Sequence, residues 1–221
     1  MVIIGPPNVG KSQLFCSLTN ALPAVADYPF ATHITTTGMM EFENIQIQLI
    51  DNLPLAPQTI EFWLLPMLRR TDALLVLVDL GEAPSAQMED VIKRLEKMRV
   101  GIGFGEAEVG HILYLRKALI IANKIDLPKA RQNYEALLNK YQDQLPLVVI
   151  SAKDGIGLEE LKLTIYQVFD IIHVYTKVPG EKLDLNEPVV LSRGSTLEEA
   201  VAEIHKDFSI YPQIWSVMGF E

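Results

Sequence analysis

The first twenty residues place the strongest constraint on how this chain folds. Residues 5–12 read Gly-Pro-Pro-Asn-Val-Gly-Lys-Ser, which fits the pattern G-x-x-x-x-G-K-[ST]. We predict a strand over the short apolar run Met1–Ile4 and a helix over Lys11–Asn20. A strand, a glycine-rich turn and a helix in this order indicate a phosphate-binding loop, or P-loop.

The residue types in this loop indicate a polyphosphate ligand. Backbone N–H groups of the loop and of the helix N-terminus would surround the phosphates, and the glycines let the backbone approach closely. We predict that Lys11 reaches the β- and γ-phosphates and that the Ser12 hydroxyl binds Mg²⁺. The predicted nucleotide-binding residues of this segment are Gly5, Asn8, Val9, Gly10, Lys11, Ser12 and Gln13.

Two later motifs indicate that the base is guanine. Residues 123–126 read Asn-Lys-Ile-Asp, and Asp126 can accept hydrogen bonds from guanine N1–H and N2–H₂, a donor pair that adenine lacks. The Asn123 amide can bond the base and tie this loop to the P-loop, while the Lys124 stem can cover the base plane. We predict that Ser151, Ala152 and Lys153 complete the base site, with the Ala152 N–H binding guanine O6. GTP or GDP is therefore the predicted ligand, and Asp126 argues against an ATP-dependent kinase.

The rest of the first 170 residues predicts an α/β fold. Apolar strands alternate with helical stretches, so βαβ units should build a mostly parallel sheet with helices on both faces, the fold of a P-loop G domain. The predicted strands are Gly38–Glu43, Ile45–Asp51, Asp72–Leu80, Lys117–Asn123 and Leu145–Ser151, and the predicted helices are Ser85–Val100, Tyr134–Tyr141 and Leu158–Phe169.

A second, smaller domain is predicted over residues 171–221, after a G domain over residues 1–170. The pattern changes near Asp170, and the later helix opens with Thr196 as a candidate N-cap and Glu199 at the capping-box position. This order of elements indicates a small α+β module. Its predicted elements are strands over Ile172–Thr176, Pro188–Leu191 and Ile214–Val217 and a helix over Ser195–Asp207.

Composition excludes several other classes of protein. The net charge of −9 argues against strong sequence-blind nucleic-acid binding, and no apolar run approaches the ~20 residues that span a bilayer. The single Cys16 is predicted to be a small core residue, and a reducing cytoplasm is the expected compartment. Glu89 and Asp90 stand four residues before Lys93 and Arg94, which predicts ion pairs along a solvated helix face.

Residues 26–32, which read Ala-Asp-Tyr-Pro-Phe-Ala-Thr, resemble the switch I signature of the Obg/DRG branch of P-loop GTPases. The resemblance implies slow, Mg²⁺-dependent hydrolysis of GTP in a regulatory switch, with Lys11 and Thr32 as catalytic residues. It places Ser12, Thr32 and Asp51 around Mg²⁺. Some relatives with Asn at the position of Asn8 use K⁺ in place of an arginine, so K⁺ dependence stays open.

The end of the chain resembles a TGS module, the β-grasp fold that follows the G domain in DRG-like proteins. The similar segments are Ile172–Gly180, Gly194–Thr196 and Ile204–Asp207. The resemblance implies contact with the ribosome or RNA, and the short apolar runs predict no membrane partner. The chain stops near where such a module ends or short of it, so a truncated module stays open, as does the oligomeric state.

One departure from the family pattern keeps a second function open. The switch II motif D-x-P-G reads Asp-Asn-Leu-Pro from Asp51 to Pro54, so proline stands where GTPases have a glycine. Proline has no N–H to give to the γ-phosphate. The alternative to a slow GTPase is therefore a guanine-nucleotide-binding scaffold with little or no hydrolysis, acting as an adaptor through its TGS-like tail.

Overall fold

The computed structural model describes residues 1–19, 24–26, 35–51, 61–104, 112–175 and 189–204. The chain separates into two compact units, Met1–Phe169 and a second unit that begins at Asp170. Each unit is described by itself below.

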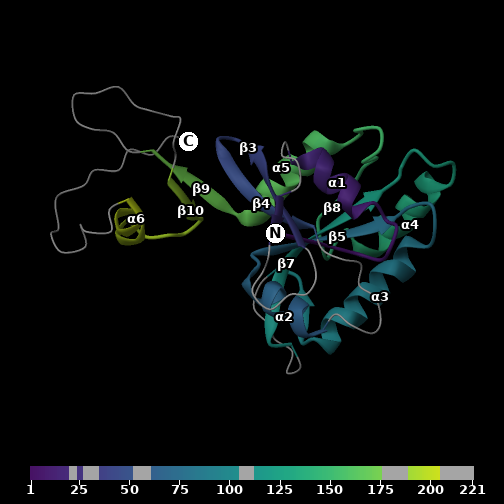
Figure 1. Ribbon diagram of the computed structural model, residues 1–221, viewed down its shortest axis with the longest axis horizontal. Helices are drawn as coiled ribbons and strands as arrows, with labels where there is room; N and C mark the ends of the chain where they lie inside the picture. The colour runs from purple at the N-terminus through teal and green to yellow at the C-terminus, as the bar shows by residue number, and fades with distance from the viewer. Residues whose placement is uncertain (20–23, 27–34, 52–60, 105–111, 176–188, 205–221) are drawn as a thin grey trace. The chain divides into compact units, whose positions relative to one another are not determined.

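The first unit is built on one mixed sheet (Figure 1). Its strands follow the order β2-β3-β4-β1-β5-β7-β6, and β8 also pairs with β7. β3 is antiparallel to its neighbours β2 and β4, and the other pairings are parallel. The mostly parallel sheet is thus confirmed. The strands are β1 (Val2–Ile4), β2 (Ala24–Ala26), β3 (Thr35–Phe42), β4 (Ile45–Asp51), β5 (Ala73–Asp79), β6 (Val100–Ile102), β7 (Tyr114–Asn123) and β8 (Leu147–Val149).

Helices cover both faces of this sheet, as Figure 1 shows for α1 and α5 on one side and α2 and α3 on the other. The reason is the alternation of side chains along each buried strand. In β5, Leu75 and Leu77 belong to the core beneath α1 and α5, whereas Leu74 and Val76 belong to the core beneath α2, α3 and α4. The helices are α1 (Lys11–Leu18), α2 (Glu61–Arg70), α3 (Pro84–Lys97), α4 (Ala130–Tyr141) and α5 (Leu158–Phe169).

Two predictions about α1 and α3 need correction. Cys16 is exposed instead of buried, because the buried face of α1 passes through Leu14, Phe15 and Leu18. The helix expected to reach Val100 ends at Lys97, and Val100 is instead the first residue of the edge strand β6. The short strands β2 and β6 and the helix α2 were not predicted.

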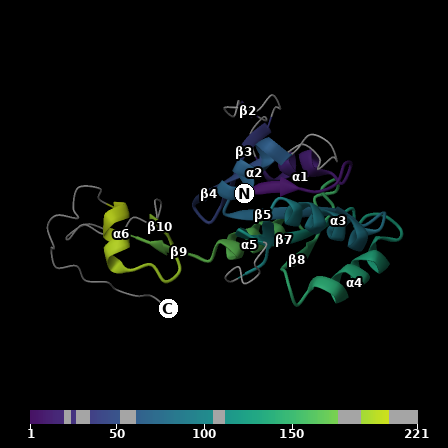
Figure 2. The same ribbon diagram turned by 90° about the horizontal axis from the view of Figure 1, so that it is seen from below.

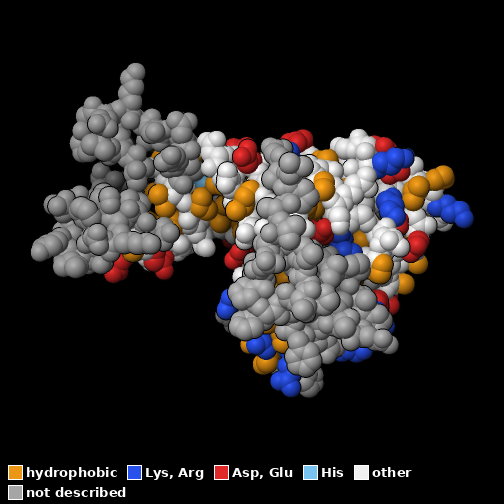
Figure 3. Space-filling view, in the orientation of Figure 1, with side chains coloured by type: hydrophobic (Ala, Val, Ile, Leu, Met, Phe, Trp, Pro, Cys, Tyr) orange, Lys and Arg blue, Asp and Glu red, His pale blue; other side chains and the backbone are white. Residues whose placement is uncertain are grey.

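The charged surface of α3 forms one of the two expected ion pairs. Arg94 Nε lies 2.8 Å from the Asp90 carboxylate, as expected for an i,i+4 pair. Glu89 pairs instead with Lys140 on the neighbouring helix α4, and this contact lowers the pKa of the Glu89 carboxyl. Acidic and basic side chains are accordingly interspersed over the coloured residues at the right of Figure 3. No helix in the described part of the chain has the length and apolar character needed to cross a bilayer.

The second unit contains an antiparallel pair of strands and a helix (Figure 2). The elements are β9 (Ile171–Val174), β10 (Val189–Ser192) and α6 (Leu197–Ile204). The predicted capping box of α6 is confirmed: the Glu199 N–H donates to Thr196 Oγ1 at 3.3 Å, and the Thr196 N–H donates to the Glu199 carboxylate at 2.7 Å. The last predicted strand, Ile214–Val217, lies outside the described residues, and the TGS fold stays a prediction.

Candidate functional site

The segments predicted to bind nucleotide meet at one edge of the sheet. β1, β5, β7 and β8 are parallel, so their carboxyl ends lie at the same edge. The P-loop follows β1, the Asn-Lys-Ile-Asp segment begins at the last residue of β7, and Ser151 comes two residues after β8. Motifs more than 100 residues apart in the sequence therefore share one site.

Two glycines allow the P-loop to take its shape. A Cβ at Gly5 would lie 2.3 Å from the Leu77 carbonyl oxygen, and one at Gly10 would lie 2.6 Å from Asn123 Nδ2. Gly10 also has a φ of +96°, which favours glycine, and it is the N-cap of α1. The loop thus lies against β5 and β7, with the N-terminus of α1 opening from it. This is the cradle that a phosphate group needs.

Lys11 is buried beside the loop, with 6% of its surface exposed. Its ammonium donates to the carbonyl oxygens of Gly5 at 3.0 Å and Pro6 at 2.6 Å. Burial lowers the pKa of Lys11 to about 8, and the negative charge of Asp51 acts in the opposite direction. A polyphosphate would supply the anionic partner that this buried cation lacks on its own loop.

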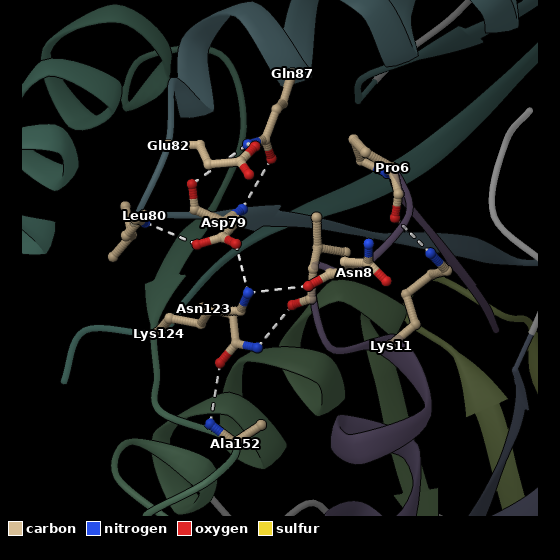
Figure 4. A network of polar contacts seen from close by, with 12 residues as sticks. Pro6, Asn8, Lys11, Asp79, Leu80, Glu82, Gln87, Asn123, Lys124 and Ala152 are labelled. Atoms are coloured by element: carbon tan, nitrogen blue, oxygen red, sulfur yellow. Dashed lines mark hydrogen bonds and ion pairs between the residues drawn. The ribbon is translucent and has the colours of Figure 1, made fainter. Parts of the chain in front are cut away.

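Asn123 joins the P-loop to both base-recognition segments (Figure 4). Its Nδ2 donates to the Val9 carbonyl oxygen at 2.8 Å, and its Oδ1 accepts from the Ala152 N–H at 3.0 Å. The side chain is 1% exposed, so both bonds are shielded from water. The predicted tie between this loop and the P-loop is present. The Ala152 N–H, predicted to bind guanine O6, donates to Asn123 in this structure.

Asp126 is exposed and oriented by a buried neighbour. The Ser151 hydroxyl donates to Asp126 Oδ1 at 2.7 Å, and Ser151 itself is fully buried. The Ile125 N–H donates to the Ile150 carbonyl oxygen at 3.1 Å, which fixes the backbone of the loop. Asp126 thus presents an exposed carboxylate, and Lys153 is exposed as well.

The residues predicted to hold Mg²⁺ are only partly described. Ser12 is exposed in the first turn of α1, next to Lys11. Asp51 ends β4 and pairs in register with Ile3 of β1, and its charge acts on Lys11. A hydroxyl and a carboxylate are oxygen ligands that suit Mg²⁺. Thr32 and Pro54 lie outside the described residues.

One residue of the site was missed by the sequence analysis. Asp79 ends β5 at the same sheet edge, is 6% exposed and lies 2.5 Å from Lys124 Nζ. A carboxylate at the end of an otherwise apolar strand was the available signal.

A P-loop after β1, a buried lysine and a second loop tied to the P-loop by Asn123 define a nucleotide-binding protein of the P-loop class. A model of the 50S ribosome-binding GTPase family matches residues 1–124, more than half of the chain. The chain therefore belongs to this family of GTP-binding P-loop proteins.

Relatives support the Obg/DRG resemblance. An uncharacterized GTP-binding protein of Methanocaldococcus jannaschii is 28% identical over 280 residues, covering 96% of this chain and 70% of that protein. The human mitochondrial ribosome-associated GTPase 2 is 34% identical over 76% of this chain and 40% of its own length. The GTPase Obg of Treponema denticola is 31% identical, covering 82% of this chain and 46% of its own. The chain thus spans less than half of the human and bacterial relatives.

Among solved structures, the G domain of the T. maritima FeoB iron transporter is similar, with 25% identity and a TM-score of 0.57. The match covers 76% of this chain and 96% of that one. The predicted fold of the first unit, an α/β P-loop G domain, is confirmed.

Proposed function

We propose that this chain binds GTP and hydrolyses it slowly to GDP with Mg²⁺, as a regulatory switch. The observation that carries the proposal is the Asn123 side chain, which links the P-loop at Val9 to the two base-recognition segments. This link, shielded from water, supports a single site in which the P-loop would bind the phosphates and Asp126 would select guanine.

Each predicted residue has a separate task in this proposal. Lys11 leaves the carbonyl oxygens of its loop and donates to the β- and γ-phosphates, while N–H groups from Asn8 to Gln13 surround them. Ser12, Thr32 and Asp51 would hold Mg²⁺, which neutralises phosphate charge when bound. Asn8 is the residue at which K⁺ would act as an additional cation.

The test of hydrolysis is phosphate release from GTP under single-turnover conditions. Wild type should release phosphate with Mg²⁺ present, and Lys11→Ala should abolish both release and tight GDP binding. Repeating the assay in KCl and NaCl at equal ionic strength tests the K⁺ proposal. Tight GDP binding by Lys11→Ala would refute the role of the P-loop.

Pro54 supports a second candidate, a guanine-nucleotide-binding scaffold without significant hydrolysis. A proline cannot donate the backbone N–H that GTPases direct at the γ-phosphate. Calorimetry with GDP and with a non-hydrolysable GTP analogue separates the two candidates. Equal affinities favour the scaffold, because exchanging the nucleotides would then shift no equilibrium. Pro54→Gly, which restores the N–H, should favour the GTP analogue.

We also propose the large ribosomal subunit as partner, with the second unit acting as a TGS-like module. The names of the family and of the human relative support the partner, and the β9–β10 pair followed by α6 supports the module. The full chain should co-sediment with 50S subunits more strongly with the GTP analogue than with GDP. Crosslinks from residues 171–204 to the subunit would support the module, and their absence in a pelleting complex would refute its role.

A further inference from the structure

Asp79 is a buried carboxylate that belongs to none of the three nucleotide-binding motifs. The six residues before it in β5, from Ala73 to Val78, are all apolar and fully buried. A charged group in such a place needs partners, because burial without them strongly disfavours the ionised form.

Both carboxylate oxygens of Asp79 have partners at the nucleotide site (Figure 4). Oδ1 accepts from the Gly81 N–H at 2.7 Å, and Oδ2 accepts from Lys124 Nζ at 2.5 Å. Lys124 Nζ also donates to the Asn8 carbonyl oxygen of the P-loop at 2.9 Å. The lysine of the base-recognition loop is therefore held between β5 and the P-loop.

The position of Asp79 is itself fixed by the helices behind it. The Asp79 N–H donates to Gln87 Oε1 of α3 at 2.9 Å. Asn133 of α4 donates to the carbonyl oxygens of Leu80 at 2.7 Å and Glu82 at 2.8 Å. The carboxylate is thus set by α3 and α4, which lie outside the nucleotide-binding motifs.

Lys124 and Asn8, which the hydrogen bond from Lys124 Nζ joins, both have unusual backbone conformations. Lys124 has a φ of +70° and Asn8 a φ of +63°, in the left-handed region that residues other than glycine seldom adopt. Such conformations persist where surrounding contacts enforce them. Asp79 supplies one of these contacts and directs the aliphatic stem of Lys124 along the P-loop.

We propose that Asp79 is a positioning residue for nucleotide binding, which holds the Lys124 stem where it covers the plane of the bound base. This inference rests on the proposed guanine-nucleotide function. Covering a base plane does not distinguish guanine from other purines, so Asp79 should raise affinity for any purine nucleotide, while Asp126 selects among them.

The experiment measures dissociation constants of the full chain for GDP, for IDP, whose base lacks the 2-amino group, and for inorganic pyrophosphate. Asp79→Asn replaces the carboxylate that Lys124 binds with an amide. Lys124→Met keeps an unbranched apolar side chain but removes the ammonium that binds Asp79. Each variant should weaken the binding of GDP and of IDP by the same factor, about tenfold. The Lys124 side chain is one-third exposed, so water screens its attraction to Asp79 only in part. Pyrophosphate binding should change by less than about twofold.

A matched control and a double variant separate positioning from general damage. Asp143→Asn makes the same change of carboxylate to amide at an exposed residue just after α4, outside this network, and should bind all three ligands like wild type. The Asp79→Asn/Lys124→Met double variant should be no weaker than the weaker single variant, because each change breaks the same contact.

The outcomes distinguish this inference from the proposed function. Wild type that fails to bind GDP refutes the function. If wild type binds GDP and Asp79→Asn binds it no more weakly than Asp143→Asn does, the inference alone is refuted. Additive losses in the double variant, or an equal loss of pyrophosphate binding, also overturn it, because they show a structural role at the P-loop. If Asp79→Asn does not fold, equal losses of GDP and IDP in Lys124→Met still support the covering stem, and unequal losses refute it.

Discussion

Replacing Asn123 by alanine should destabilise the first unit even when no nucleotide is present. The change removes the donor to the Val9 carbonyl oxygen and the acceptor for the Ala152 N–H, both at a site where the side chain is 1% exposed. Leaving a buried polar group without its partner costs about 1–3 kcal/mol. Two such groups therefore predict a loss of roughly 2–6 kcal/mol, a large share of the ~5–15 kcal/mol that stabilises a typical domain.

Asn123→Asp provides a sharper version of the same test. The carboxylate keeps the acceptor for Ala152 but turns an oxygen toward the Val9 carbonyl, where the amide had donated. The folded state then favours the protonated carboxyl, so the pKa of the new Asp rises on folding. This variant should therefore regain stability as pH falls, the opposite of an ion-paired carboxylate.

The assay is urea unfolding of the nucleotide-free chain, followed by circular dichroism at several pH values. Asn139→Ala is the control, because Asn139 is an exposed asparagine on α4, and its replacement should change stability by less than about 0.5 kcal/mol. If Asn123→Ala is no less stable than Asn139→Ala, the two buried hydrogen bonds do not hold the site together and the reasoning is wrong.

Three further predictions follow from the same structure. Burial lowers the pKa of Lys11 to about 8, so above that pH the unfolded state binds more protons than the folded state. Between pH 7.5 and 9.5, urea unfolding should therefore show that wild type gains about 2 kcal/mol of stability relative to Lys11→Met. Gly10→Ala should abolish GDP binding and lower the melting temperature, because its Cβ would lie 2.6 Å from Asn123 Nδ2 at a φ of +96°; unaltered binding in calorimetry would contradict this. Thr196→Ala should lose about 1 kcal/mol of protection in α6 by removing the bond to the Glu199 N–H, as hydrogen exchange would show, with no change in GDP affinity.

The sequence predicts the sheet and the location of the site because both follow from local rules. A G-x-x-x-x-G-K-[ST] pattern at Gly5–Ser12 requires a strand before it and a helix after it, and β1 and α1 occupy those places. The capping box at Thr196 is equally local, since its two residues are three apart and on one helix. Long apolar strands such as β5 are identified by length and composition alone.

What the sequence could not predict depends on contacts between distant residues. Glu89 has Lys93 as its neighbour on the same helix, yet it pairs with Lys140, because α4 packs beside α3 and brings that ammonium within reach. The role of Asp79 likewise appears only when β5 and β7 pair in register, with Asp79 opposite Asn123 and therefore beside Lys124. No spacing rule connects residues 45 positions apart.

The contacts between the end of β7 and the P-loop explain why GDP affinity alone cannot distinguish a switch from a scaffold. Adjacent residues Asn123 and Lys124 donate to the adjacent carbonyl oxygens of Val9 and Asn8, at 2.8 and 2.9 Å. These contacts join the base site to the P-loop, and both nucleotides carry the base and the β-phosphate. These contacts should therefore raise the affinities for GDP and GTP by the same factor. Any preference for GTP must come from groups that meet only the γ-phosphate, so Pro54→Gly should change the ratio of the two affinities, whereas Asn123→Ala should weaken both in proportion.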